Sequence, residues 1–323
     1  MKTLLSAATI ALCAATPALA GKAFVTNERG NTITVVDTES WEPITEFFGG
    51  NRPRGVTVSP DGTKLYICAS DDNIVRVFDT ATYEELPALP SGPDPELFII
   101  EPTGERLYIA NEDDNLVTVT NTETRTVIAE VPVGVEPEGM GMSPDAKWVV
   151  NTSETTNMAH FISTDDYTIK HNVLVDQRPR YAQYSDDGAR LYVTSEIGGT
   201  VSVMDIDADG APTVVGKVSF EVPGVLPEWL QPVGAKVTPD GSRLFVALGP
   251  ANRVAVVDTQ SLEVLKYILV GQRVWQLAFT PDKKHLLTTN GNSNDITVID
   301  VAKEKAIRSI PVGDQPWGVV VID

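Results

Sequence analysis

Short stretches in which apolar and polar residues alternate follow one another along most of this chain, and turn residues separate them. Thr32–Val36 and Leu116–Val119 are two examples. Alternation with a period of two is typical of β-strands that bury one face. No stretch sustains the longer period of an amphipathic helix. The pattern therefore predicts an all-β fold made of many short antiparallel strands.

One tight turn recurs between these stretches. Ser59–Gly62 reads Ser-Pro-Asp-Gly, and Thr238–Gly241 repeats it with a single change. Proline presets the second turn position, and glycine adopts the left-handed conformation that ends the turn. Degenerate copies occupy residues 101–104, 143–146, 185–188 and 280–283. Each copy lies between two β-rich runs, so each is predicted to close a hairpin.

A second marker gives the period of the repeat. The strand before each turn opens on a proline in six repeats, and on Val274 in the seventh; the prolines are Pro53, Pro95, Pro137, Pro179, Pro232 and Pro316. The intervals are 42 residues except for one of 53 between Pro179 and Pro232. A period of about 40–45 residues rich in short strands indicates a β-propeller with one four-stranded blade per repeat. We therefore predict a seven-bladed β-propeller of four-stranded antiparallel blades.

The two ends of the repeat region complete one blade. The chain stops after Val319–Asp323, a first strand, whereas Ala23–Asn27 reads as a second strand with no first strand before it. Pairing of these two segments would close the ring and leave no free edge between the first and last blades. A third strand ends on an acid in most repeats, and such side chains can bond their own downstream backbone.

The first 20 residues have the features of a secretory signal peptide. A basic start at Lys2 precedes the apolar run Leu4–Ala15, and Ala18–Ala20 forms an A-x-A cleavage site. We expect cleavage after Ala20, a propeller domain over residues 21–323, and a periplasmic location. Cleavage leaves one cysteine, Cys68, which is expected to be a buried core thiol.

Charge excludes some partner classes. The whole chain has 25 basic and 44 acidic residues, so loss of Lys2 leaves 24 basic residues and a net charge of about −20. Such a surface repels nucleic acids and anionic membranes. We expect a soluble monomer that binds neither.

The repeat residues resemble those of a known family. Phe24–Asn27, Tyr108–Asn111 and the Ser59–Gly62 turn resemble the YVTN family of β-propeller repeat proteins. The signal peptide followed by seven blades is similar to the periplasmic subfamily associated with PQQ-dependent alcohol catabolism. The resemblance implies an accessory binding role beside a quinoprotein dehydrogenase or a transporter component. It supplies no catalytic residues and no cofactor for this chain.

The loops that enter the first strands surround the mouth of the central channel, where propellers commonly bind ligands. Around this mouth the residues at equivalent positions differ from one repeat to the next. The predicted ligand- or partner-binding residues are Arg52, Arg54, Asp94, Glu96, Glu136, Glu138, Arg178, Arg180, Arg273, Trp275 and Trp317. Gln231, Val233 and Gln315 occupy the remaining places of the two rings.

Two interpretations of the mouth stay open. The charges could form salt bridges between blades, which add little net stability. They could instead form one wall of a pocket that faces the aromatic wall of Trp275 and Trp317, for a small molecule or a docked protein. In either case we expect neighbouring arginines to keep Glu96 and Glu138 ionised, which favours binding over acid–base catalysis.

The longer fourth repeat contains an apolar loop, residues 222–230. Val225, Leu226 and Trp229 would form a contact surface if exposed, and Trp229 is included among the predicted binding residues. The alternative is a loop folded back on its own blade.

Other chemistry has few candidates. His160, His171 and His285 fall on different strands away from the channel, so we expect surface side chains and no triad or histidine metal site. The run Asp205-Asp207-Asp209 resembles the start of a calcium loop, but Gly216 stands where the bidentate glutamate belongs. Calcium binding there stays open.

The sequence therefore favours a non-enzymatic periplasmic binding or scaffold propeller, accessory to PQQ-dependent alcohol catabolism and an associated transport system. No metal, cofactor or catalytic residue is assigned. Two alternatives remain: a lactonase-type propeller hydrolase and a cell-surface protein-interaction propeller.

Overall fold

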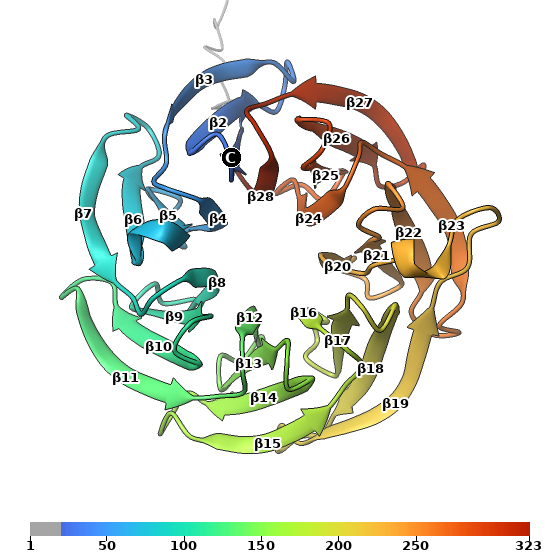
Figure 1. The fold of residues 1–323 in the computed structure, drawn as a ribbon, viewed down its shortest axis with the longest axis horizontal. Helices are drawn as coiled ribbons and strands as arrows, with labels where there is room; N and C mark the ends of the chain where they lie inside the picture. Colours follow the sequence, from blue (N-terminus) through green and yellow to red (C-terminus); the bar gives the residue numbers. More distant parts are fainter. Residues whose placement is uncertain (1–20) are drawn as a thin grey trace, which may run out of the picture.

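A computed structural model describes residues 21–323 as seven blades around a central channel (Figure 1). Every blade is a four-stranded antiparallel sheet whose first strand lies nearest the channel and whose fourth lies at the rim. The predicted seven-bladed fold is confirmed. The predicted signal peptide lies outside the described residues.

The strands recur in the same order in each blade. The inner strands are β4 (Pro53–Val58), β8 (Pro95–Ile100), β12 (Pro137–Met142), β16 (Pro179–Tyr184), β20 (Ala235–Val237), β24 (Val274–Phe279) and β28 (Pro316–Ile322). The second strands are β1 (Lys22–Asn27), β5 (Lys64–Ala69), β9 (Arg106–Asn111), β13 (Trp148–Ser153), β17 (Arg190–Ser195), β21 (Arg243–Ala247) and β25 (His285–Asn290).

The outer half of each blade completes the sheet. The third strands are β2 (Thr32–Asp37), β6 (Ile74–Asp79), β10 (Leu116–Asn121), β14 (Met158–Ser163), β18 (Thr200–Ile206), β22 (Arg253–Asp258) and β26 (Asp295–Asp300). The fourth strands are β3 (Pro43–Phe48), β7 (Glu85–Pro90), β11 (Thr126–Pro132), β15 (Ile169–Leu174), β19 (Pro212–Ser219), β23 (Val264–Leu269) and β27 (Lys305–Pro311).

The helical content of residues 21–323 is two short 3₁₀ turns, η1 (Ser70–Asp72) and η2 (Pro227–Trp229). No helix in this part of the chain has the length and apolar character needed to cross a bilayer.

The core lies between blades. Tyr66 and Cys68 of β5 pack against Phe98, Leu107 and Ile109 of the next blade, and the same arrangement recurs around the ring. Each such side chain contributes about 1.5–3 kcal/mol when it leaves water. Cys68 is fully buried, and burial raises the pKa of its thiol well above the usual range. The predicted core thiol is confirmed.

The repeated turn has the geometry that its sequence predicts. Gly62 has a φ of 71°, and the Lys64 amide donates to the Ser59 hydroxyl at 2.9 Å. The Ser59 hydroxyl in turn donates to Asp61. Third-strand acids also behave as expected, because the Asp37 carboxylate accepts the amide of Ser40 at 2.7 Å and this bond lowers its pKa. These turns and acids are part of the blade architecture.

The blade after the long loop departs from the prediction. Its inner strand β20 has three residues and begins at Ala235, not at Pro232. The amide of Gly234 donates to the Trp275 carbonyl of the next blade at 3.0 Å, so the segment before β20 is held across the blade junction. The loop itself combines both alternatives: Val222 and Leu230 are buried, whereas Leu226 and Trp229 are 55% and 53% exposed.

The ring closes between the two ends of the chain. β28 pairs with β1 in antiparallel register, with Phe24 opposite Val320 and Val25 opposite Val319 (Figure 1). The predicted closure is confirmed.

We predict that a chain ending at Gly313 loses its cooperative thermal unfolding, because it lacks β28, exposes the edge of β1 and loses the packing of β28 against β4 and β24. Circular dichroism melting measures this. A chain lacking only Asp323, which follows β28, is the control and should melt as the full chain does. An unchanged melting temperature without residues 314–323 would contradict the closure.

Candidate functional site

An asparagine from the preceding blade sets the backbone at six of the seven entries to the mouth. Asn157, in the turn before β14, accepts the amide of Arg178 at 3.1 Å. Asn252 accepts the amide of Arg273 at 2.9 Å in the same way. The equivalent pairs are Asn31 with Arg52, Asn73 with Asp94, Asn115 with Glu136, and Asn294 with Gln315. Each residue held in this way has a left-handed backbone, which directs its side chain to the mouth.

A third ring of side chains joins the two predicted rings at the mouth. It is formed by equivalent residues of the seven repeats, just after the second strand of each blade, and its members are Glu28, Ser70, Glu112, Glu154, Glu196, Gly249 and Gly291. The amide of Glu112 donates to the Asp94 carbonyl, and that of Glu196 to the Arg178 carbonyl, at 2.9 and 2.8 Å. The ladder between the first two strands thus places this ring beside the predicted ones. Sequence analysis missed these glutamates, although the 42-residue interval relates them.

On one side of the mouth, arginines of the first blade reach carboxylates of the next two. Arg52 contacts Asp94 and bonds Glu96 at 2.8 Å. Arg54 contacts the same Glu96 oxygen and lies 3.7 Å from Glu138. These are the predicted salt bridges between blades.

A second cluster lies on the opposite side of Glu138. Arg180 bonds Glu138 at 3.0 Å and also contacts Glu154. Arg178 bridges Glu154 and Glu196 at 3.0 and 3.1 Å. Arg273 reaches across from another blade to Glu196 at 2.7 Å. Three arginines therefore converge on the Glu154 and Glu196 carboxylates.

Burial decides the protonation of these carboxyls more than the arginines do. Glu96 is fully buried, and desolvation raises its pKa well above the usual range despite Arg54. Desolvation likewise raises the pKa of Glu154 to about 7, against the pull of Arg180. At Glu96, removal from water therefore opposes the expected effect of the arginines, because burial disfavours the charged form that they favour.

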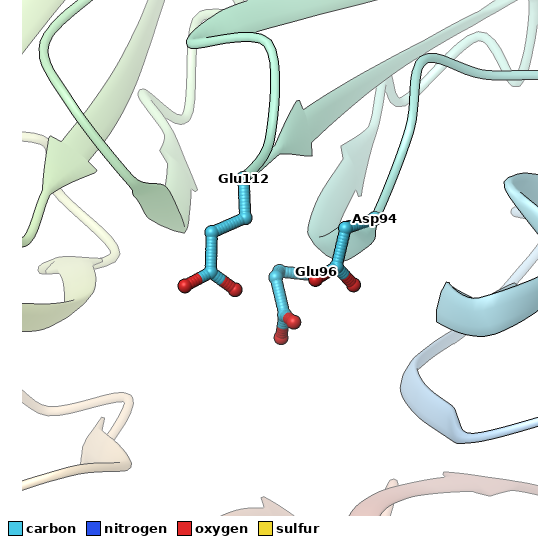
Figure 2. A group of neighbouring side chains, drawn as sticks. All are labelled: Asp94, Glu96 and Glu112. Carbon is cyan, nitrogen blue, oxygen red and sulfur yellow. The ribbon is translucent and has the colours of Figure 1, made fainter.

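Glu196 and Glu112 complete the range of environments. Burial alone would raise the pKa of Glu196, but Arg180 and Arg273 together hold it below the usual value. The pKa of Glu112 is raised by burial and by the charge of Glu138. No arginine lies within salt-bridge distance of Glu112 in the described part of the chain, and its carboxyl lies beside Glu96 and Asp94 (Figure 2).

A cavity of about 270 Å³ opens at this mouth. Its walls are Arg54, Glu112, Arg178, Arg180, Glu196, Ile197, Arg273 and Trp275. Five of these residues were predicted; Glu112, Glu196 and Ile197 were not. The cavity therefore brings the Glu112 carboxyl, which lies beside Glu96, together with four arginines.

The predicted aromatic wall is only half present. Trp275 lines the cavity with Arg273 3.9 Å above its ring, whereas Trp317 is fully buried beneath Arg54. Two glycines make room on this side: a Cβ at Gly291 would lie 2.6 Å from the Trp275 ring nitrogen, and one at Gly249 would lie 2.7 Å from Arg273. Trp229, on η2, is not a wall residue of the cavity.

None of the three histidines is a wall residue of the cavity at the mouth. The prediction of surface side chains is wrong for His160, which is buried; its Nε2 accepts the Gly134 amide and its Nδ1 faces Asn172. Burial lowers the pKa of His160, so the neutral ring is a structural hydrogen-bonding group.

Two groups of carboxylates come close enough to hold a cation. Oxygens of Asp94, Glu96 and Glu112 lie within 4.8 Å of one another (Figure 2). Those of Glu112, Glu136 and Glu154 do so as well. Arg52 already occupies Asp94 and Glu96, and Arg178 and Arg180 occupy Glu154. These arginines supply positive charge that a metal ion would otherwise provide.

The Asp205–Asp209 turn uses its own oxygens. The Asp207 carboxylate accepts the amides of Asp209 and Ala211 at 3.0 and 2.8 Å, and Asp205 bonds Arg190 at 3.1 Å. The pattern that resembles a calcium loop therefore closes the turn between β18 and β19.

Comparison with known proteins gives two family matches. Residues 169–307 match the model of the seven-bladed β-propeller lactonases, and residues 41–79 match the WD domain, G-beta repeat. No curated protein matches the chain.

Solved structures with the same fold belong to proteins that are described as having different activities. A periplasmic gluconolactonase of Pseudomonas aeruginosa is 17% identical over 94% of this chain and 99% of its own, with a TM-score of 0.77. A candidate 6-phosphogluconolactonase of Bacteroides fragilis is 18% identical over 96% and 100%, with a TM-score of 0.81. Hydrazine synthase of Kuenenia stuttgartiensis is 21% identical over 86% and 92%, with a TM-score of 0.78. At these identities the likeness establishes the fold.

The lactonase match overturns the expected non-enzymatic accessory role. The match covers the blades that supply Arg178, Arg180, Glu196, Arg273 and Trp275. Burial raises the pKa of Glu96 and Glu154, so the neighbouring arginines do not exclude acid–base chemistry at the mouth.

We predict opposite pH effects at the two buried glutamates Glu154 and Glu196. The pKa of Glu154 rises from 4.5 to about 7 on folding, so its ionisation destabilises the fold as pH increases across that window. Glu154→Gln should therefore gain stability relative to the wild type between pH 4.5 and 7, by up to about 3 kcal/mol.

The matched variant Glu196→Gln should do the reverse. Its folded-state pKa is lowered, so the carboxylate stabilises the fold above pH 4.5, and the deficit of the variant should shrink as pH falls below that value. Urea unfolding across pH 4–8 measures both. Parallel pH profiles for the two variants would contradict the assigned environments.

Proposed function

We propose that this protein hydrolyses a sugar lactone at the channel mouth. The observation that carries the proposal is the Glu112 carboxyl, which lines a 270 Å³ cavity together with Arg178, Arg180 and Arg273 and has no arginine salt bridge among residues 21–323. The match of residues 169–307 to the lactonase model supports the proposal. The similar propellers described as gluconolactonases suggest an aldonolactone as the substrate class.

Lactone hydrolysis needs a base for water and a group that stabilises the developing oxyanion. Ionised Glu112 accepts a proton as the oxygen of a water molecule bonds to the lactone carbonyl carbon. The carbonyl oxygen takes the negative charge. When the carbonyl re-forms, the ring C–O bond breaks and the leaving oxygen receives the proton from Glu112. The product is the open-chain hydroxy acid, and the base is regenerated.

Glu112 fits the role of base better than its neighbours do. Glu96 and Glu154 are buried and are not wall residues of the cavity. Glu196 faces the cavity, but its arginine partners lower its pKa and so weaken it as a base. Burial raises the pKa of Glu112, and a base with a higher pKa accepts a proton from water more readily.

The arginines supply the electrophilic wall. Arg180 is buried and fixed by Glu138, so its position costs no reorganisation when charge develops on the substrate. Arg273 lies over Trp275, which offers a flat apolar surface for the carbon face of a sugar ring. The indole nitrogen of Trp275 is buried on the side of Gly291 and has no hydrogen-bond partner among the described residues.

We predict that Glu112→Gln lowers kcat/KM for D-glucono-1,5-lactone by about 10²–10⁴-fold, because the amide cannot accept the proton from water. A pH-indicator assay of lactone opening, corrected for spontaneous hydrolysis, measures this. Glu123→Gln, on an exposed turn of the same blade, is the matched control and should keep full activity. Equal rates for wild type and Glu112→Gln would exclude Glu112 as the base. No hydrolysis of any aldonolactone by the wild type would refute the proposed function.

The acid limb of the pH–rate profile gives an independent check. Glu112 acts ionised, so kcat/KM should fall as pH drops through its pKa, which lies above the usual 4.5. The residual rate of Glu112→Gln should lack this limb. A limb that persists unchanged in the variant would assign the titration to another group.

A further inference from the structure

The central channel contains a second cavity, of about 340 Å³, towards the hairpin ends of the inner strands. Its walls include Leu97, Tyr181, Gln183, Lys236 and Gln276. None of these residues takes part in the lactone site at the mouth. Lys283 and Asp186, both exposed, lie at the rim of the cavity in the hairpin turns.

Lys236 has an ammonium group with no carboxylate partner among the described residues. Its Nζ donates to the Tyr181 hydroxyl at 2.7 Å and lies 3.4 Å from the Gln183 side-chain oxygen. The Tyr181 ring lies 5.1 Å from the same nitrogen. Lys236 is half-buried, so its ammonium group lies in a partly dry site where its hydrogen bonds go to neutral partners alone.

Two more donors face the same cavity. The Tyr181 hydroxyl accepts from Lys236, which leaves its own hydrogen free to donate. The side-chain nitrogen of Gln276 has no hydrogen-bond acceptor in the described part of the chain, although Gln276 is only 6% exposed. A buried donor without an acceptor costs about 1–3 kcal/mol, so a complementary ligand would remove that cost.

An ammonium, a hydroxyl and an amide nitrogen match the acceptor oxygens of one carboxylate group. We propose that the channel cavity binds a small organic monocarboxylate, with its carboxylate on Lys236, Tyr181 and Gln276 and its body along the channel. The volume of 340 Å³ accommodates a six-carbon chain. This site goes beyond the proposed lactonase activity and does not depend on it.

The test compares gluconate with sorbitol, which has the same number of carbons but no charge. Isothermal titration calorimetry of the full protein should detect gluconate binding and no sorbitol binding. Lys236→Met keeps most of the side-chain stem, removes the charge, and should weaken gluconate binding by about tenfold or more. Tyr181→Phe removes only the hydroxyl and should weaken binding severalfold, which keeps the test valid if Lys236→Met fails to fold.

Two controls locate the binding. Lys283→Met, at the exposed rim, should bind gluconate as the wild type does. Gluconate is also the product of the reaction proposed at the mouth, so Arg273→Gln should lose only a mouth component of the heat and keep the binding that depends on Lys236. Absence of gluconate heat in the wild type would overturn the proposal, since water alone would then satisfy the donors. The proposal would also be overturned if Arg273→Gln lost gluconate binding while Lys236→Met kept it. That result would assign gluconate to the mouth.

Discussion

The hydrogen bond from each turn asparagine to the next blade is the constraint on which the mouth depends. It joins two blades and, in the same contact, holds the residue before the inner strand in a left-handed conformation. The orientation of Arg178 and Arg273 towards the axis thus depends on an asparagine that lies 21 positions earlier in the chain. The junction before β20 has Gly199 in place of asparagine, and there the inner strand shrinks to three residues. Blade packing and site geometry are thus set by one repeated interaction.

Close approach at the axis determines what can line the channel. A Cβ at Gly55 would lie 2.5 Å from the Glu96 carbonyl, and one at Gly318 would lie 2.6 Å from the Arg54 carbonyl. Glycine is needed where a neighbouring backbone takes the space, and larger residues such as Tyr181 and Gln276 project from the strands between. Small and large positions therefore interleave around the ring, as the taper of a propeller requires.

The repeat made the fold predictable, whereas the site depends on burial that a sequence does not display. The interval of 42 residues predicts blade number, hairpins and closure, since each follows from local turn chemistry and strand period. It also contains the ring of Glu112, Glu154 and Glu196, which alignment on the prolines alone overlooks. The raised pKa of Glu96 was missed because a sequence shows which charged partners are available but not how deeply each side chain is buried. Trp317 was placed in the wall for the same reason, although Arg54 covers it.

The burial of these carboxyls also explains why the mouth suits acid–base catalysis better than binding alone. Carboxylates outnumber arginines there, so full ionisation would leave net negative charge in a partly dry site. Burial resolves this by raising the pKa of Glu96, Glu112 and Glu154, while the arginines remain charged. A wall of permanent cations then faces carboxyls whose protons can move. A surface that only docks a partner gains nothing from mobile protons, whereas acyl hydrolysis needs both elements within one cavity.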